Sequence, residues 1–196
     1  MPPTVITQNF GNGTLDPPEI VDPEPPQSLD DPMVVYNEAA PLAASLQAPA
    51  NMKDYIARFH RVALAEQRKF GIPASISLAQ GIIESRSGSS ELTKRANNHF
   101  GIKCFSKKCK RGHCVNFEDD HAKDFFRKFG NAWESWRAHS QMITTGRYKH
   151  LTRYGSDYRK WAYGLKKAGY ATDRTYAEKL IGVIEANNLQ RFDRQP

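Results

Sequence analysis

The stretch GIIESRSGSSELTKRANNHFGIKC, residues 81–104, joins an apolar segment to a polar one and places an acid at the junction. Before it, PASISLAQ (73–80) leads into Ile82 and Ile83, so the segment is apolar on almost every side and predicts a central buried helix. Glu84 ends that run, and Ser and Gly residues typical of a turn follow. Helix-end carbonyls and apolar neighbours both disfavour a carboxylate, so we expect a raised pKa for Glu84.

A carboxyl group that stays protonated near neutral pH can donate its proton to a glycosidic oxygen. Such a reaction needs a second carboxylate across the cleft, which activates water or stabilises positive charge. The sequence offers an acidic cluster for this role, Glu118, Asp119 and Asp120. By spacing alone, however, a solvated surface acid is the simpler interpretation of Glu84.

The segments around the central helix predict an α+β fold. Helices are predicted from Asn51 to Gly71, over 90–96, from Asn131, from Ser156 through Leu165, and after Asp173. Residues 99–128 consist of short aromatic and β-branched runs broken by Gly and Lys, a pattern typical of a small antiparallel sheet. We therefore expect a mainly helical body with a small β lobe inserted after the central helix.

Charge and proline divide the chain into two parts. Residues 1–50 hold seven acids, no Lys or Arg, and ten of the twelve prolines. Residues 51–196 carry all 28 Lys and Arg residues, so this part is strongly basic. We predict an acidic, extended arm at 1–50 and a folded domain at 51–196. The arm is either a disordered leader or a strap that docks on a partner.

Neither a secretory signal nor an apolar run of membrane-spanning length is recognisable in the sequence. The expectation is a chain made in the cytoplasm without a signal peptide.

Four motifs resemble one family of enzymes: LAQGIIES, GSSELTKRANNHFGIKC, FFRKF and GLKKAGYATDRTYAEKLI. Together they are similar to the glucosaminidases of glycoside hydrolase family 73, which includes bacterial autolysins and the hydrolase domain of the flagellar rod-cap protein. The resemblance covers about residues 52–190. It implies a lysozyme-like fold and an endo-β-N-acetylglucosaminidase that cuts the β-1,4 glycan of peptidoglycan, with no cofactor required.

The resemblance also implies roles for individual residues. Glu84 matches the general acid, Glu118 is the first choice for the second acid, and Tyr170 matches a tyrosine that lines the catalytic centre. The implied substrate-binding residues are Asn98, His99, Phe100, Asp120 and Tyr176. The chain departs from the family at Arg86, where Gly is common. An arginine there either lowers the pKa of Glu84 or points outward toward anionic substrate groups.

Three cysteines, Cys104, Cys109 and Cys114, lie at C-x4-C-x4-C spacing, with His113 and His121 close by. One disulfide with a free thiol, a structural zinc site and three plain thiols are all compatible with this pattern. The disulfide is the first choice, because x4 spacing in both gaps is not a strong zinc signature. We expect no catalytic metal.

The functional hypothesis is therefore a peptidoglycan hydrolase whose partner is the glycan strand. We expect it to act on the cell wall, in the periplasm or outside the cell, after delivery by a non-Sec route, with residues 1–50 as a possible docking strap for a phage or injection apparatus. The alternative is a non-catalytic wall-binding or assembly module. Nucleic-acid binding is disfavoured because the sequence contains no known motif for it and its basic residues are spread out.

Overall fold

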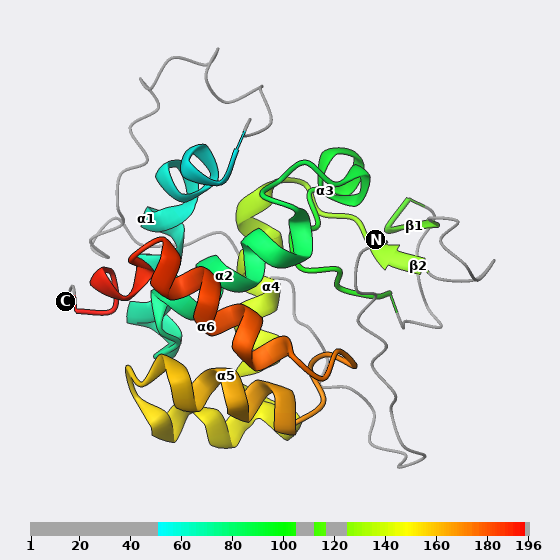
Figure 1. Ribbon diagram of the computed structural model, residues 1–196. Helices are drawn as coiled ribbons and strands as arrows, with labels where there is room; N and C mark the ends of the chain where they lie inside the picture. Colours follow the sequence, from blue (N-terminus) through cyan, green and yellow to red (C-terminus); the bar gives the residue numbers. More distant parts are fainter. Residues whose placement is uncertain (1–50, 105–111, 117–124, 195–196) are drawn as a thin grey trace, which may run out of the picture. The chain divides into compact units, whose positions relative to one another are not determined.

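The computed structural model describes residues 51–104, 112–116 and 125–194, and helices make up most of this part of the chain (Figure 1). The α-helices are α1 (Met52–Phe70), α2 (Ala74–Ser85), α3 (Glu91–Ala96), α4 (Ala132–Ile143), α5 (Tyr158–Lys167) and α6 (Tyr176–Ala186). The strands are β1 (Cys114–Asn116) and β2 (Phe125–Arg127), and the 3-10 helices include η2 (Gly146–Tyr154) and η3 (Leu189–Arg191). The arm at 1–50 lies outside the described residues.

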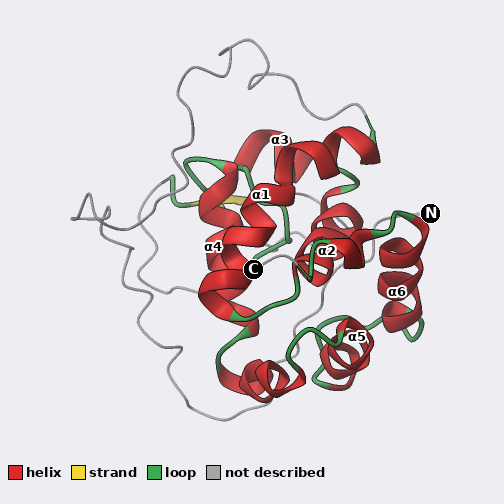
Figure 2. Ribbon diagram, turned by 90° about the vertical axis from the view of Figure 1, so that its left-hand side faces the viewer, coloured by secondary structure: helices red, strands yellow, loops and turns green. Residues whose placement is uncertain are grey.

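Helix α2 forms the centre of the helical body, as the sequence predicts. All of its residues except Ile83 and Glu84 are buried. Helices α1, α5, α6 and η3 pack against it, and the two views show it in the middle of the helices (Figures 1 and 2). A helix that is apolar all round needs such a position, because each exposed face would leave apolar surface in water.

Several helix ends confirm the predicted capping residues. The Asn51 side chain accepts a hydrogen bond from the Asp54 N–H at 3.1 Å, and the Asn131 side chain accepts one from the Glu134 N–H at 3.0 Å. Gly71 ends α1 with a positive φ of 70°. The predicted start of the 156–165 helix was wrong: Asp157 caps it through the Lys160 N–H at 3.0 Å, and the helix begins at Tyr158.

The predicted small antiparallel sheet is present. Strands β1 and β2 pair antiparallel, with Val115 opposite Phe126, and Lys103 forms an additional bridge to Phe126. The buried amide of Asn98 joins this sheet to the end of α3, since its Nδ2 donates to the carbonyl oxygens of Ile102 and Arg127, both at 2.9 Å. The Asn98 side chain thus contributes to holding the base of the β lobe, together with the hydrogen bond from the Phe129 N–H to the Ala96 carbonyl oxygen.

An ion pair joins α1 to α4 in the helical body. Glu66 is fully buried, and Arg137 Nε contacts its two carboxylate oxygens at 2.9 and 3.1 Å. The guanidinium group also lies over the rings of Trp133 and Phe70. A buried carboxylate is tolerated when it is paired in this way, because an unpaired one would lose its hydration without compensation.

Among the described residues, the structure contains no helix both long and apolar enough to cross a membrane.

Candidate active site

Glu84 lies one residue before the end of α2, where the chain turns sharply. Ser85 organises this turn, because its hydroxyl donates to the Gly81 carbonyl oxygen at 2.5 Å and accepts from the Gly88 N–H at 2.7 Å. Arg86 and Ser87 both adopt left-handed backbone conformations, with φ values of 52° and 55°. Non-glycine residues rarely do so, and such strain is often found at functional sites. The turn leaves Glu84 partly exposed at the end of the buried helix.

Tyrosine side chains from the far end of the sequence enclose the carboxyl group of Glu84. The Tyr176 hydroxyl donates to Glu84 Oε1 at 2.9 Å, across a sequence separation of 92 residues. Gln80, one turn earlier on α2, donates from Nε2 to the same hydroxyl at 3.2 Å. The ring of Tyr170 stacks on that of Tyr176, with centroids 5.5 Å apart. The acid therefore contacts the hydroxyl of Tyr176, and Tyr170 packs behind that ring.

Burial raises the pKa of Glu84 from 4.5 to about 8, and the hydrogen bond from Tyr176 offsets only part of that effect. Arg86 does not contribute to this shift, and it is exposed. Burial, followed by the nearby Glu84 charge, raises the pKa values of Tyr170 and Tyr176 well above 10. At neutral pH the site therefore holds a protonated carboxylic acid beside two neutral phenols.

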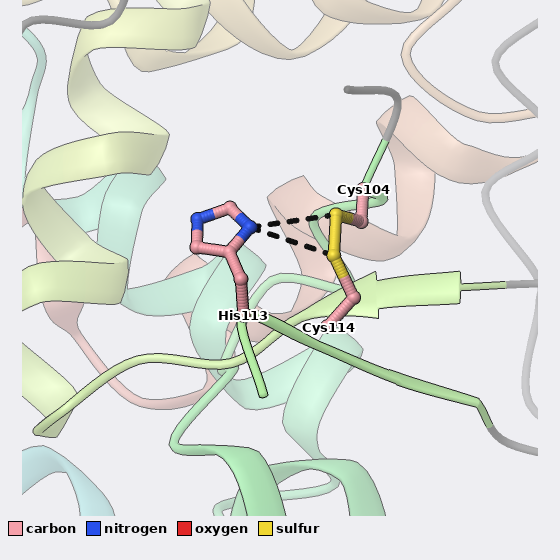
Figure 3. Close-up of side chains that lie close together, drawn as sticks. All are labelled: Cys104, His113 and Cys114. Carbon is pink, nitrogen blue, oxygen red and sulfur yellow. Dashed lines mark hydrogen bonds between the residues drawn. A yellow bond between two sulfur atoms is a disulfide. The ribbon is translucent and has the colours of Figure 1, made fainter. Parts of the chain in front are cut away.

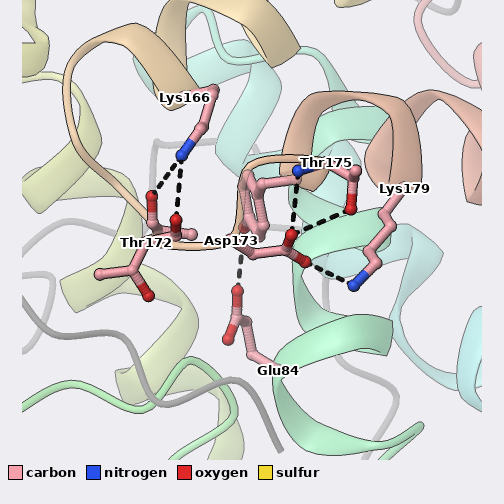
Figure 4. A network of polar contacts seen from close by, with 8 residues as sticks. Glu84, Lys166, Thr172, Asp173, Thr175 and Lys179 are labelled. Atoms are coloured by element: carbon pink, nitrogen blue, oxygen red, sulfur yellow. Dashed lines mark hydrogen bonds and ion pairs between the residues drawn. The ribbon is translucent and has the colours of Figure 1, made fainter.

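The segment that carries the tyrosines is tied down on both sides (Figure 4). Lys166 Nζ donates to the carbonyl oxygens of Ala171 and Thr172, both at 3.2 Å. Asp173 accepts from the N–H and the hydroxyl of Thr175, and it forms an ion pair with Lys179. The Lys179 contact is the main reason that the pKa of Asp173 falls to about 2. These contacts fix the backbone just before Tyr176.

Replacing Tyr176 by phenylalanine removes the hydroxyl that stabilises the ionised form of Glu84. The pKa of Glu84 should therefore rise further, because the hydrogen bond from Tyr176 is the effect that lowers it. We expect the alkaline limb of the pH profile of kcat/KM, near pH 8 in the parent, to move to higher pH. Tyr163→Phe is the matched control, because Tyr163 is exposed on α5. An unmoved limb in Tyr176→Phe would show that this contact does not tune the acid.

Asn98, His99 and Phe100 are all buried in the described structure. Phe100 stacks on His139 with ring centroids 3.9 Å apart, and His99 Nδ1 contacts the Tyr55 hydroxyl at 2.9 Å. Burial lowers the pKa of His99 to about 3, so its imidazole is neutral. These contacts attach the segment to α1 and α4, and a direct role of the three residues in substrate binding stays a prediction.

Glu118, Asp119 and Asp120 lie outside the described residues. In the sequence they fall in residues 117–124, between β1 and β2. The candidate site thus consists of Glu84, Tyr170, Tyr176 and Gln80 among the described residues. An open hollow of about 570 Å³ elsewhere on the surface is lined by residues of η2, of α5 and of the turn between them, including Tyr154, Asp157 and Lys160. It contains none of the candidate catalytic residues, and Asp157 there is used as a helix cap.

Gln80 and His139 were not singled out by the sequence analysis. Gln80 occupies an otherwise apolar helix four residues before Glu84, and a lone amide in such a run is the signal that could have identified it.

His139 is fully buried, and neither ring nitrogen has a hydrogen-bond partner among the described residues. Burial lowers its pKa to about 3, so it remains neutral where it stacks on the ring of Phe100.

The cysteine cluster lies at the β lobe (Figure 3). Cys104 and Cys114 are joined by a disulfide that closes a sequence separation of 10, which agrees with the preferred interpretation of the sequence. Cys109 lies outside the described residues. His113 is the neighbour of the disulfide, with Nδ1 close to both sulfur atoms.

Solved structures of an amidase and of a glycoside hydrolase domain have a similar fold. An N-acetylmuramoyl-L-alanine amidase from Staphylococcus aureus gives a TM-score of 0.64 at 30% identity, over 74% of this chain and 44% of that one. The glycoside hydrolase domain of FlgJ from Salmonella typhimurium gives a TM-score of 0.59 at 26% identity, over 72% of this chain and 91% of that one. The fold and the enclosed acid at the end of α2 define a lysozyme-like glycoside hydrolase domain.

The chain belongs to the glucosaminidase family, described as mannosyl-glycoprotein endo-beta-N-acetylglucosaminidase, whose pattern matches residues 60–189. A curated relative is the exo-glucosaminidase LytG of Bacillus subtilis, 35% identical over 139 residues, which are 64% of this chain and 48% of LytG. Peptidoglycan hydrolase FlgJ of Salmonella typhimurium is 28% identical, over 68% of this chain and 45% of FlgJ. The chain thus spans about half the length of these two relatives.

Proposed function

We propose that this domain is an endo-β-N-acetylglucosaminidase that cleaves the β-1,4 glycan strand of peptidoglycan, with Glu84 as the general acid. The observation that carries the proposal is the enclosed carboxyl of Glu84, with a pKa of about 8, at the end of the central helix. The description of the family and the names of LytG and FlgJ support the substrate class.

In the proposed reaction, the Glu84 proton passes to the glycosidic oxygen as the bond to the anomeric carbon breaks. Positive charge then develops on the sugar ring, and a second carboxylate must stabilise it or activate the attacking water. Glu118 is the first candidate for this role. Tyr170 stacks on Tyr176, and its buried hydroxyl has no hydrogen-bond partner among the described residues, so Tyr170 is a candidate to position the site or to stabilise the developing cation.

The proposal is tested by digesting purified, insoluble peptidoglycan and analysing the products by mass spectrometry. An endo-glucosaminidase releases fragments of several lengths with N-acetylglucosamine at the new reducing ends. Release of single sugar units from chain ends would instead indicate an exo-acting enzyme, as the name of LytG describes. Free peptides with intact glycan strands would indicate amidase activity. Binding to the wall without any product would favour the alternative, a non-catalytic wall-binding module.

The second acid can be identified by a scan of residues 118–120. Glu118→Gln should reduce turnover strongly and leave wall binding nearly unchanged, because the change removes charge and keeps shape. Asp119→Asn and Asp120→Asn serve as matched controls, and Asp120 is also a candidate for substrate binding. Full activity in Glu118→Gln with a large loss in a neighbour would transfer the role to that neighbour. Full activity in all three variants would favour assistance by the substrate's own acetamido group.

We further propose that residues 1–50 bind a structural protein that delivers the enzyme to the wall. The proposal rests on composition: the arm holds seven acids and ten prolines, and an extended segment loses less conformational freedom on docking than a flexible coil does. Residues 1–50 alone should capture the delivery protein. Deletion of 1–50 should leave cleavage of purified walls intact. If the deletion instead unfolds the domain, as judged by circular dichroism, the arm is a structural element.

A further inference from the structure

Three side chains of the types that ligate metals converge in the β lobe. Cys104 Sγ, Cys114 Sγ and His113 Nδ1 all lie within 4.8 Å of one another. His113 Nδ1 is 3.6 Å from Cys104 Sγ and 3.5 Å from Cys114 Sγ, and Figure 3 shows the imidazole facing both sulfur atoms. The contact to Cys104 crosses nine residues of sequence, so chain proximity does not explain it.

The two nitrogen–sulfur distances match those around a tetrahedral zinc ion. With Zn–S bonds of about 2.3 Å and a Zn–N bond of about 2.0–2.1 Å, tetrahedral angles place the ligand nitrogen about 3.6 Å from each sulfur. A disulfide needs no imidazole, because its sulfur atoms are already joined and are weak hydrogen-bond acceptors. A zinc ion does need a third ligand, and His113 Nδ1 is at the distance that such a ligand would have.

Backbone contacts hold the three residues in place independently of the sulfur–sulfur bond. The Cys104 N–H donates to the Phe125 carbonyl oxygen at 2.8 Å, and Cys114 pairs with Arg127 in the sheet. The His113 carbonyl oxygen accepts from the Lys128 N–H at 2.9 Å. All three segments are therefore attached to β2 or to the residue next to it. After reduction, only side-chain rotation is needed to part the sulfur atoms to the roughly 3.8 Å of a tetrahedral site.

We propose that the reduced protein binds one Zn²⁺ ion through the thiolates of Cys104 and Cys114 and through Nδ1 of His113. Binding releases the two thiol protons and involves no electron transfer. The disulfide form has no thiolates and does not bind the ion. The proposed ion joins the same two segments that the disulfide joins, at Cys104 and at Cys114 of β1, so the β lobe has a covalent link when oxidised and a metal link when reduced.

The test uses the full chain, reduced with a phosphine and freed of metal by a chelator. One equivalent of Zn²⁺ is added, unbound ion is removed by desalting, and zinc per chain is measured by mass spectrometry. Affinity is then measured by competition with a chromophoric chelator. The reduced parent should retain about one zinc per chain, whereas the oxidised parent should retain none. Equal retention by both forms would overturn the proposal, because the disulfide form lacks the ligands.

The decisive variant is His113→Ala, because it leaves both cysteines able to form the disulfide. Loss of an outer-shell partner of a metal ligand typically costs 10–100-fold in affinity, so loss of the ligand itself should cost at least about 100-fold. The matched control is His150→Ala, an exposed histidine on η2, which should bind like the parent. Oxidation of His113→Ala should still give the disulfide, as a count of free thiols will show.

Cys104→Ser and Cys114→Ser should each lose the ion, while Cys109→Ser should keep one zinc per chain. Substitution of Co²⁺ for Zn²⁺ should give thiolate-to-metal charge-transfer absorption that disappears in both of the first two variants. The proposal fails if the reduced parent retains no zinc, or if His113→Ala binds zinc as tightly as the parent. It also fails if Cys109→Ser abolishes binding while His113→Ala does not, since the ligands would then be three cysteines.

Discussion

Glu84→Gln should lower the rate of peptidoglycan cleavage by about 10²–10⁴-fold, the usual contribution of a positioned general acid. Glutamine has the shape of the protonated acid and can still contact the Tyr176 hydroxyl, but it has no proton to give to the leaving oxygen. The loss should appear in kcat, while binding to the wall should change little. Release of soluble fragments from purified walls, measured under single-turnover conditions, gives the rate directly.

Glu91→Gln is a suitable control for this variant. Glu91 is exposed in the first turn of α3, and its salt bridge to Lys94 is a surface contact of small energetic value. This control should cleave walls at the parental rate. If Glu84→Gln also retains that rate, Glu84 is not the proton donor, and the acid at the end of α2 has a structural role only.

The same Glu84→Gln variant should be more stable than the parent at neutral and alkaline pH. The pKa of Glu84 rises from 4.5 to about 8 in the folded protein, so folding favours the protonated form. Between these two values the unfolded chain gives up the proton and the folded chain keeps it. The parent therefore loses stability as pH rises from about 4.5 toward 8, at up to about 1.4 kcal/mol per pH unit.

The stability difference should be visible as a trend with pH in urea unfolding. From pH 5 to pH 8, the free energy of unfolding of Glu84→Gln should gain about 3–4 kcal/mol relative to that of the parent. Glu91→Gln should show no such trend. A difference between Glu84→Gln and the parent that is constant across this pH range would contradict the raised pKa.

The sequence predicts the helical body well because its signals are local. Asn51, Gly71 and Asn131 act within a few residues of their own position, and the apolar run of α2 is visible as a run. The small antiparallel sheet was also predicted, from aromatic and β-branched segments. The raised pKa of Glu84 was expected from its neighbours on the helix. The structure shows that burial is the main cause, and this burial involves residues distant in sequence.

The contacts that complete the site could not be predicted from local pattern. Tyr176 was named as a substrate-binding residue only through the family resemblance, because core packing and catalysis give the same local sequence signal. Only the three-dimensional arrangement shows that its hydroxyl contacts both Glu84 and Gln80. The ion pair of Glu66 with Arg137 spans 71 residues, and nothing near either residue indicates its partner. Asp157 was missed as a cap because Ser156 beside it has the same capping chemistry.

Tyr176, whose hydroxyl contacts Glu84, is made late in protein synthesis. Tyr176 follows Glu84 in the chain by 92 residues, so the ribosome makes it much later. Asp193 is made later still, and its carboxylate binds Ser75 at the start of α2. A nascent chain that ends before Tyr176 thus has the acid without the phenol that holds it and without α6, which packs on α2. The contacts around the end of α2 that carries Glu84 can therefore be completed only after α6 has been made.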